Sequence, residues 1–215
     1  MILENGVIVF GAGGHAKVAI DVLLSAGRPV VACITPDGGG ALAGIPILSE
    51  SSGLPDLLAK GYRAAFVAIG DNRIRRREAI RLRLNGLQLV NAVSPRAYIA
   101  ENVWFGTGIL VMHGVVINSG SRIDDDAIIN TASSVDHDNR IGAGVHIAPG
   151  SHLAGTVTVA DGAFIGIGSV VLPGLTIGRG AVVGAGSVVV EDVAEYHRAW
   201  GNPARDKGRR QDDHD

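Results

Sequence analysis

The chain has 215 residues, a formal net charge of −2 and a single cysteine. The slight acidic surplus disfavours a nucleic-acid-binding protein, and one cysteine excludes an internal disulfide. No apolar run reaches the ~18 residues of a membrane span, and no basic segment precedes an apolar N-terminal run, so we expect a cytoplasmic protein. Only 4% of the residues are aromatic although 47% are hydrophobic, so the apolar mass is almost entirely aliphatic.

The first ~90 residues alternate between strand and helix patterns. Apolar segments at 7–10, 30–34 and 64–69 predict buried strands, and 87–92 predicts a last short one. A glycine turn and then a helix follow the first strand, and the segment 70–86 predicts a helix that ends at a glycine. The pattern indicates a small parallel α/β sheet with too few strands for a full dinucleotide-binding fold.

The turn after the first strand, "GAGGHAK", spans Gly11 to Lys17. Glycines between a strand and a helix N-terminus expose backbone N–H groups that favour a phosphate, and Lys17 could reach one. The stretch also fits the loose pattern G-x-G-x-x-A of NAD-binding proteins, and a purely structural turn is a third interpretation. Against NAD, the second strand has no acid at its end, because Asp37 is set back in a loop.

A second polar segment, "GDNRIRRR", follows the third strand at 70–77. Open α/β sheets bind ligands at the carboxyl ends of their strands, so Asn72 and Arg73 are candidate nucleotide contacts. The remaining arginines are expected on a solvated helix face. They are Arg75, Arg76, Arg77, Arg81 and Arg83.

From Ile99 to Val189 an aliphatic or aromatic residue recurs at every sixth position, through sixteen hexads without an insertion. Small residues recur four positions after these, and glycines mark tight corners. The period indicates a solenoid of short strands that bury one residue of each hexad. The segment resembles the left-handed parallel β-helix of acyltransferases, in which three hexads form one coil.

The stretch "NTASSVDHDNRIG" interrupts this plain pattern by placing His137 between Asp136 and Asp138. Since Val135 points inward, His137 is expected to point outward, where Asp138 could hold its imidazole in one tautomer. With 18 residues per coil, Gly155 stacks above His137 and leaves room for a substrate. An ordinary surface histidine is the competing interpretation.

The whole chain resembles the nucleotide-sugar acyltransferases, which include bacterial sialic acid O-acetyltransferases and N-acetyltransferases of 4-amino-4,6-dideoxy nucleotide sugars. The resemblance rests on "GAGGHAK", "GIPIL", "AIGDNRIRR", "VNAVSPRA", "IINTASSVDHD", "HIAPGSHLAG" and "GNPAR", which occur in the family's order between residues 7 and 205. It implies a nucleotide-sugar-binding α/β domain at 1–93, a left-handed β-helix acyltransferase domain at 94–194, and a C-terminal cap and tail at 195–215, with "RRQDDHD" as the tail.

The resemblance also implies roles for individual residues. His137 would be the general base and Asp138 its orienting carboxylate, with His146 and the Gly155 backbone N–H near the acetyl carbonyl. The acceptor sugar would contact Asn130, and the nucleotide would contact Gly13, Gly14, His15, Asp37 and Asn72. Acetyl-CoA would lie between the three-sided β-helices, here called prisms, of a homotrimer, and no metal is required. The family often has two acids after the second strand, whereas "TPDGGG" has one.

We therefore expect an acetyl-CoA-dependent N-acetyltransferase for a GDP- or UDP-linked 4-amino-4,6-dideoxy sugar, in surface-polysaccharide biosynthesis. O-acetylation of a sugar is the close alternative. A γ-class carbonic anhydrase would share the β-helix, but it needs converging zinc ligands, and His146 and His152 are six residues apart. An NAD-dependent oxidoreductase and a non-catalytic nucleotide-binding scaffold are rival functions of different classes.

Overall fold

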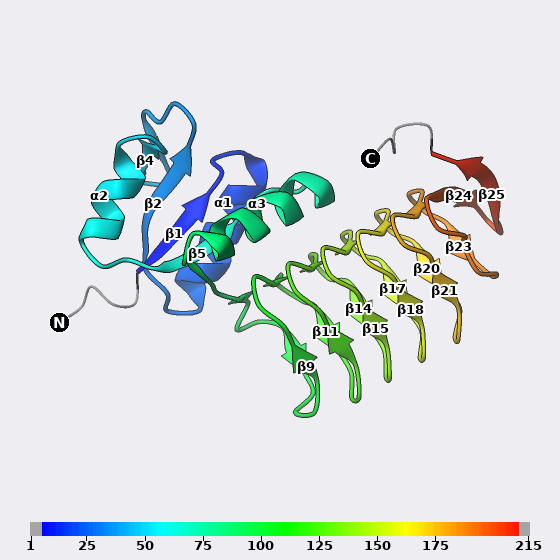
Figure 1. Cartoon of the computed structure of the whole chain (residues 1–215). Helices are drawn as coiled ribbons and strands as arrows, with labels where there is room; N and C mark the ends of the chain where they lie inside the picture. The colour runs from blue at the N-terminus through cyan, green and yellow to red at the C-terminus, as the bar shows by residue number, and fades with distance from the viewer. Residues whose placement is uncertain (1–5, 211–215) are drawn as a thin grey trace. The chain divides into compact units, whose positions relative to one another are not determined.

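The computed structural model describes residues 6–210. The chain divides between Pro95 and Arg96 into two compact units (Figure 1). Within residues 6–210, no helix combines the length and the apolar character that crossing a membrane requires.

The N-terminal unit is built on a six-stranded sheet with the strand order β3-β4-β2-β1-β5-β6. Its strands are β1 (Val7–Phe10), β2 (Val30–Thr35), β3 (Ala41–Leu42), β4 (Ile45–Ser49), β5 (Ala64–Val67) and β6 (Gln88–Leu89), and β7 (Ala92–Val93) follows. Its helices are α1 (Gly14–Ser25), α2 (Gly53–Ala59) and α3 (Asn72–Leu84). The predicted parallel sheet is confirmed, but the antiparallel pair β3–β4 and the helix α2 were not anticipated.

Burial explains why the central strands were recognisable in the sequence. All four residues of β1 are buried between β2 and β5, which both pair with it in parallel. A strand covered on both faces is continuously apolar, and that pattern is visible without a structure. At the start of α3 the Asp71 side chain accepts the Ile74 N–H at 2.8 Å, and Gly86 follows the helix at a φ of 78°.

The C-terminal unit is a parallel β-helix made of three sheets. One contains β10 (Leu110–Val111), β13 (Ile128–Ile129), β16 (His146–Ile147), β19 (Phe164–Ile165) and β22 (Val182–Val183). A second contains β8 (Tyr98–Ile99), β11 (Val116–Ile117), β14 (Ser134–Val135), β17 (His152–Leu153), β20 (Val170–Val171) and β23 (Val188–Val189). The third contains β9 (Trp104–Phe105), β12 (Arg122–Ile123), β15 (Arg140–Ile141), β18 (Thr158–Val159) and β21 (Thr176–Ile177).

Each strand ends on the predicted inward residue, and residues 18 apart are partners in successive coils. Val135, for example, pairs with Ile117 on one side and Leu153 on the other. Ile117 and Val135 are fully buried, and Leu153 is 2% exposed. Each repeat of six residues in the sequence thus forms one side of a three-sided coil.

Four residues, here called a corner, connect successive strands. The third corner residue usually has a positive φ, and it is usually glycine, as at Gly120 and Gly174. Asp126, Ala132, Asp138 and Thr156 are exceptions that adopt this conformation with a side chain. For an L-residue this backbone costs about 1–2 kcal/mol, so a side chain kept there calls for a reason.

The last coil is followed by the hairpin of β24 (His197–Gly201) and β25 (Ala204–Arg209). Strand β24 pairs in parallel with β22, and β25 pairs antiparallel with β24. Arg209 lies in β25, so the tail predicted for 209–215 is wrong at its first residue, and 211–215 lie outside the described residues.

The stack of inward side chains predicts that two neighbouring residues of β21 contribute very differently to the free energy of unfolding. Ile177→Ala should lower the free energy of unfolding by about 2–5 kcal/mol, because it opens a cavity in the prism. Thr176→Ala, in the same strand but with an exposed side chain, should change it by less than about 0.5 kcal/mol. Urea denaturation monitored by circular dichroism measures both. Equal losses in the two variants would contradict the assigned orientation of the strand.

Candidate active site

The central feature is a histidine–aspartate pair on the corner 136–139, between β14 and β15. His137 Nδ1 lies 2.9 Å from Asp138 Oδ2, and both side chains are more than half exposed. A carboxylate at this nitrogen fixes the tautomer in which Nδ1 carries the proton, so the Nε2 lone pair is available. The pair can therefore take up a proton from a bound group.

Two glycines in adjacent coils make room for the pair. A Cβ atom built on Gly120 would collide with Asp138 Oδ1, and one built on Gly155 would collide with His137 Nε2. Gly155 does not have a positive φ, so space rather than backbone conformation requires a glycine there. His137 Nε2 thus lies directly against the backbone of Gly155, as the coil period predicted.

Asp136 fixes the other side of the histidine. Its Oδ1 accepts the His137 backbone N–H at 2.8 Å and the Asn118 side-chain amide at 2.9 Å from the coil below. The Asn118 bond, followed by the His137 bond, lowers the pKa of Asp136. The Asp136 carboxylate is therefore ionised at neutral pH, beside His137.

This setting raises the pKa of His137 above its usual value. The first cause is the hydrogen bond to Asp138, and the negative charges of Asp136 and Asp138 add to it. A base with a raised pKa binds a proton more tightly, but it is neutral over a smaller range of pH. Any reaction that uses neutral His137 should therefore slow as the pH falls through this pKa.

Gly155, whose backbone lies against the imidazole, has an N–H group that is available as a hydrogen-bond donor. Within the described chain its N–H donates to no protein atom, whereas its carbonyl accepts the Gly174 N–H at 3.1 Å. A donor next to a base is an arrangement that can stabilise an oxyanion.

Asn130, on the corner 130–133, and His146, in β16, form a second polar pair. Asn130 Nδ2 lies 3.0 Å from His146 Nε2, and Asn130 Oδ1 accepts the Thr131 N–H at 2.8 Å. The amide nitrogen therefore faces the ring, which makes Nε2 the acceptor. His146 is 8% exposed and meets the Phe164 ring edge-on, with centroids 5.2 Å apart.

The structure does not gather all the predicted polar groups of the β-helix in one place. Asn130 lies on the corner between β13 and β14, whereas His137 lies on the next corner, between β14 and β15. The side chain of His152 is bonded to Ser134 on the face between them, with His152 Nδ1 2.8 Å from Ser134 Oγ. Within one chain, the base and the Asn130–His146 pair are thus at opposite edges of one face.

In the N-terminal unit, the predicted nucleotide contacts follow the carboxyl ends of three neighbouring strands. Gly13 and Gly14 follow β1, Asp37 follows β2, and Asn72 and Arg73 follow β5 at the start of α3. Cβ atoms built on Gly13 and Gly14 would meet nothing within 4 Å, so these glycines leave the start of α1 open to a close approach. Helix α1 has neither a side-chain cap nor an acid in its first turn, which suits an anion. Lys17 is exposed on the same helix.

His15 and Arg75 lie behind the exposed residues at this edge of the sheet. Arg75 is 1% exposed, so its assignment to a solvated face of α3 is wrong. Its guanidinium donates to the carbonyls of Ile69 and Gly70, at 3.1 and 3.0 Å, and to Asn72 Oδ1, at 2.9 Å. Burial, and after it the charge of Arg75, lowers the pKa of His15 to about 4, so His15 is neutral at physiological pH.

The other arginines of α3 differ from Arg75. Arg77 is exposed, Arg76 and Arg83 are half-buried, and Arg81 is paired with Glu50 and Glu78. Sequence reasoning missed Arg75 because helical spacing alone did not separate it from its neighbours.

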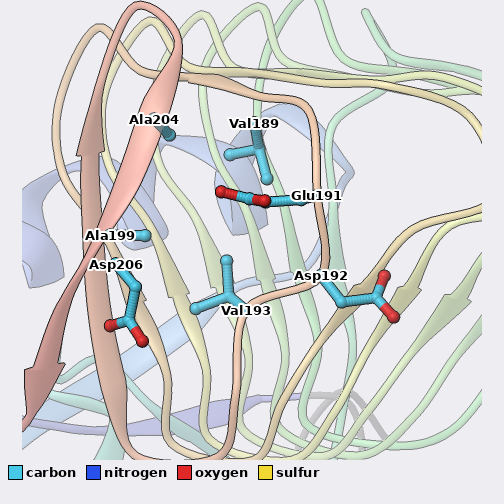
Figure 2. Close-up of a pocket in the computed structure, with 7 residues that line it drawn as sticks. All are labelled: Val189, Glu191, Asp192, Val193, Ala199, Ala204 and Asp206. Atoms are coloured by element: carbon cyan, nitrogen blue, oxygen red, sulfur yellow. The ribbon is translucent and has the colours of Figure 1, made fainter.

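A cavity of about 250 Å³ lies elsewhere, between the last coil and the hairpin β24–β25 (Figure 2). It is lined by Val189, Glu191, Asp192, Val193, Ala199, Ala204 and Asp206. In Figure 2 the Glu191 side chain reaches across the pocket, whereas Asp192 points away from it. Carboxylates around the pocket disfavour a phosphate-bearing ligand, and none of the predicted site residues lines it. Among residues 6–210, no group of three or more His, Cys, Asp or Glu side chains is arranged to hold a metal ion.

Comparison with known proteins places these features in a family. Residues 6–82 match the PglD N-terminal domain, and residues 156–190 match the bacterial transferase hexapeptide repeat. Together with the full-length relatives below, these matches show that the chain belongs to the acetyltransferases of nucleotide amino sugars, which join an α/β domain to a left-handed β-helix. The predicted family and fold class are confirmed.

One solved relative is PerB, the perosamine N-acetyltransferase of Caulobacter crescentus, in complex with CoA and GDP-perosamine. It is 47% identical, with a TM-score of 0.91, and the match covers 94% of this chain and 97% of that one. Variants of that enzyme with one histidine replaced by asparagine or alanine have also been solved. The acetyltransferase domain of PglB from Neisseria gonorrhoeae, with acetyl coenzyme A, is 33% identical, covers 94% and 99% of the two chains, and gives a TM-score of 0.89.

A curated relative, the uncharacterized protein L142 of Acanthamoeba polyphaga mimivirus, is 30% identical over 115 residues. The match covers 53% of this chain and 22% of that protein, so it spans about a fifth of the length of the relative.

The charges around His137 predict the effect of one substitution. Asp138→Asn should lower the pKa of His137 toward the ordinary value of about 6.5, because the hydrogen bond to a carboxylate favours the charged imidazolium. Histidine titration by NMR, with the His137→Ala spectrum for assignment, measures the shift. Asp124→Asn is the control, since Asp124 pairs with Arg122. An unchanged His137 pKa in Asp138→Asn would show that the pair is not formed in solution.

Proposed function

We propose that the protein transfers the acetyl group of acetyl-CoA to the amine of a GDP-linked 4-amino-4,6-dideoxy sugar. The observation that carries the proposal is the His137–Asp138 pair, with His137 Nε2 held against the Gly155 backbone. The relative that binds CoA and GDP-perosamine supports both the donor and the nucleotide. Because acetyl-CoA and nucleotide sugars are cytoplasmic metabolites, we place the reaction in the cytoplasm, where it would precede assembly of a surface polysaccharide.

The pair on the β-helix provides base catalysis. The neutral sugar amine attacks the thioester carbonyl carbon, and His137 Nε2 takes the proton that the new C–N bond makes acidic. The C–S bond then breaks, and the departing sulfur receives the proton, so that the products are the amide and CoA. Asp138 keeps Nδ1 protonated throughout and stabilises the imidazolium.

The Gly155 N–H supplies the second element, a donor to the carbonyl oxygen as its negative charge grows. Losing a single donor of this kind typically lowers the rate by about 10²–10³-fold. The donor is a backbone group, so it is rigid before the substrate binds.

The N-terminal unit binds the nucleotide in this proposal. The start of α1 at Gly13 and Gly14 receives the diphosphate, and Lys17 and Arg73 add positive charge. The remaining contacts at this edge are His15, Asp37 and Asn72. Arg75 holds the Asn72 oxygen, so the Asn72 amide nitrogen is oriented as a donor.

The separation of His137 from the Asn130–His146 pair supports a homotrimer. If both belong to one active site, neighbouring prisms must meet so that one subunit supplies His137 and the next supplies Asn130 and His146. Cyclic packing of three prisms brings different corners of adjacent subunits together. Acetyl-CoA then occupies the groove between the prisms.

The direct test of the activity is the release of CoA from acetyl-CoA, followed with a thiol reagent and a panel of GDP- and UDP-linked 4-amino-4,6-dideoxy sugars. A GDP-linked amino sugar should support turnover, and His137→Ala should lower kcat by about 10²–10⁴-fold. In the wild type, kcat/KM should fall as the pH drops through the raised pKa of His137, because only the neutral ring accepts a proton. Asp138→Asn should move this acid limb to lower pH.

Arg140→Ala is the control variant, since its exposed side chain lies in the strand after the His137 corner. Turnover that survives His137→Ala would remove this residue as the base. Turnover only with sugars that carry a hydroxyl in place of the amine would replace N-acetylation by O-acetylation, and no turnover with either set would reject the proposed activity.

The shared site predicts complementation between two inactive variants. His137→Ala and Asn130→Ala should each be slow alone, whereas subunits co-expressed in equal amounts should recover about a quarter of the wild-type activity, because each mixed interface can combine two intact halves. Analytical ultracentrifugation of the mixture gives the subunit number. Trimers without any recovery would show that each active site is confined to one subunit.

A further inference from the structure

The corner that carries His137 is closed differently from several other corners of the β-helix. In the corners 130–133, 142–145 and 166–169, the N–H of the fourth residue donates to the carbonyl of the first, at 3.1, 3.3 and 3.2 Å. In the corner 136–139, the Asn139 N–H donates instead to Ser121 Oγ, at 3.1 Å. Side chains thus replace the backbone bond at the candidate catalytic corner.

The Asn139 side chain makes most of these replacement bonds. Its Nδ2 donates to the Asp136 carbonyl at 2.7 Å and to the Ala154 carbonyl at 3.0 Å, and its Oδ1 accepts the Val157 N–H at 2.8 Å. The residue is fully buried in the prism. Both donor hydrogens and the carbonyl oxygen of the amide are therefore used, in a site that excludes water.

These bonds join two corners that face each other in adjacent coils. The corner 136–139 carries His137 and Asp138, and the corner 154–157 carries Gly155 and Thr156. The Thr156 N–H also donates to the His137 carbonyl, at 2.9 Å. Asn139 thus helps to set the spacing and tilt of the two backbones between which the imidazole lies.

An amide at this position is not needed to fill the prism. The same interior position holds Ser121 one coil below and Val157 one coil above, and both are buried. Burying an amide is costly unless each polar atom is bonded, whereas an aliphatic residue carries no such requirement. The amide is therefore better explained by what it holds in place than by its contribution to packing.

We propose that Asn139 is a positioning residue for the reaction: its buried carboxamide fixes the His137 corner against the Gly155 corner, and so aligns the base with the oxyanion donor. The inference rests on the proposed function. Asn139 itself touches no substrate, and it acts through the backbone on either side of His137 and Asp138.

The test uses replacements that the solenoid already accommodates at this position. Asn139→Val copies the coil above and removes all three side-chain bonds, and Asn139→Ser copies the coil below and keeps one hydroxyl. Misplacing a catalytic group by about 1 Å can cost about 10²-fold, so we expect kcat of Asn139→Val to fall roughly 10–100-fold. The KM values for acetyl-CoA and the nucleotide sugar should change by less than about threefold, because the binding groups stay in place.

Ser169→Ala is the matched control. Ser169 is also fully buried in the prism, and its Oγ donates to the Gly184 carbonyl at 2.9 Å, away from the His137 corner. This variant should lose stability, as Asn139→Val does, but it should keep the wild-type kcat.

A second readout needs no substrate. NMR titration of His137 should give a lower pKa in Asn139→Val than in the wild type, because a loosened corner weakens the hydrogen bond to Asp138, whereas Ser169→Ala should leave the pKa unchanged. The His137 pKa in Asn139→Ser should lie between the values in the wild type and in Asn139→Val. Asn139→Ser takes the place of Asn139→Val if the valine variant does not fold.

If folded Asn139 variants lose stability but keep both kcat and the His137 pKa, Asn139 is only a structural residue and the proposal is overturned. If the wild type acetylates none of the acceptors, the proposed function fails, while the comparison of His137 pKa values still decides whether Asn139 orders the corner.

Discussion

The register of 18 residues between coils is the constraint on which the rest of the β-helix depends. Inward aliphatic side chains such as Ile117, Val135 and Leu153 stack on one another, and this stacking fixes which corners face each other. Because of that register, Gly120 lies where the Asp138 carboxylate needs space and Gly155 lies where the His137 ring needs it. A one-residue slip would turn the buried side chains outward and would separate Asp138 from Gly120 and His137 from Gly155.

The corner 136–139 departs from the repeat at two positions where the residue usual in the repeat would give a more stable protein. Asp138 occupies a positive-φ position that glycine holds in most other corners, and Asn139 occupies an interior position that suits an aliphatic residue. The positive φ of Asp138 costs free energy, whereas the Asn139 amide is tolerated in the interior only because each of its polar atoms is bonded. Both residues place a polar group where it acts on His137. Local departures from an otherwise consistent pattern are expected at functional sites, since stability there is exchanged for geometry.

The N-terminal unit brings distant residues together by different means. Parallel strands β1, β2 and β5 are neighbours in the sheet, so the segments after them share one edge although they are separated by more than 20 residues in the chain. The buried Arg75 ties down the segment that leads into α3, and the nearby charge helps to keep His15 neutral. The proposed nucleotide site thus combines open glycines at the surface with a buried arginine behind them.

The sequence by itself determined the period of six, the inward residues, the central strands and the stacking of Gly155 on His137, because a repeat with a fixed period makes three-dimensional neighbours calculable. It did not determine the burial of Arg75, since helical spacing cannot say what covers a helix face. Nor did it indicate that Asn139 joins two corners, because those bonds depend on backbone positions that form only when the coils are stacked. The tertiary structure alone also showed that Asn130 and His146 are bonded to each other, since the period places residues on faces and corners but does not say which side chains meet.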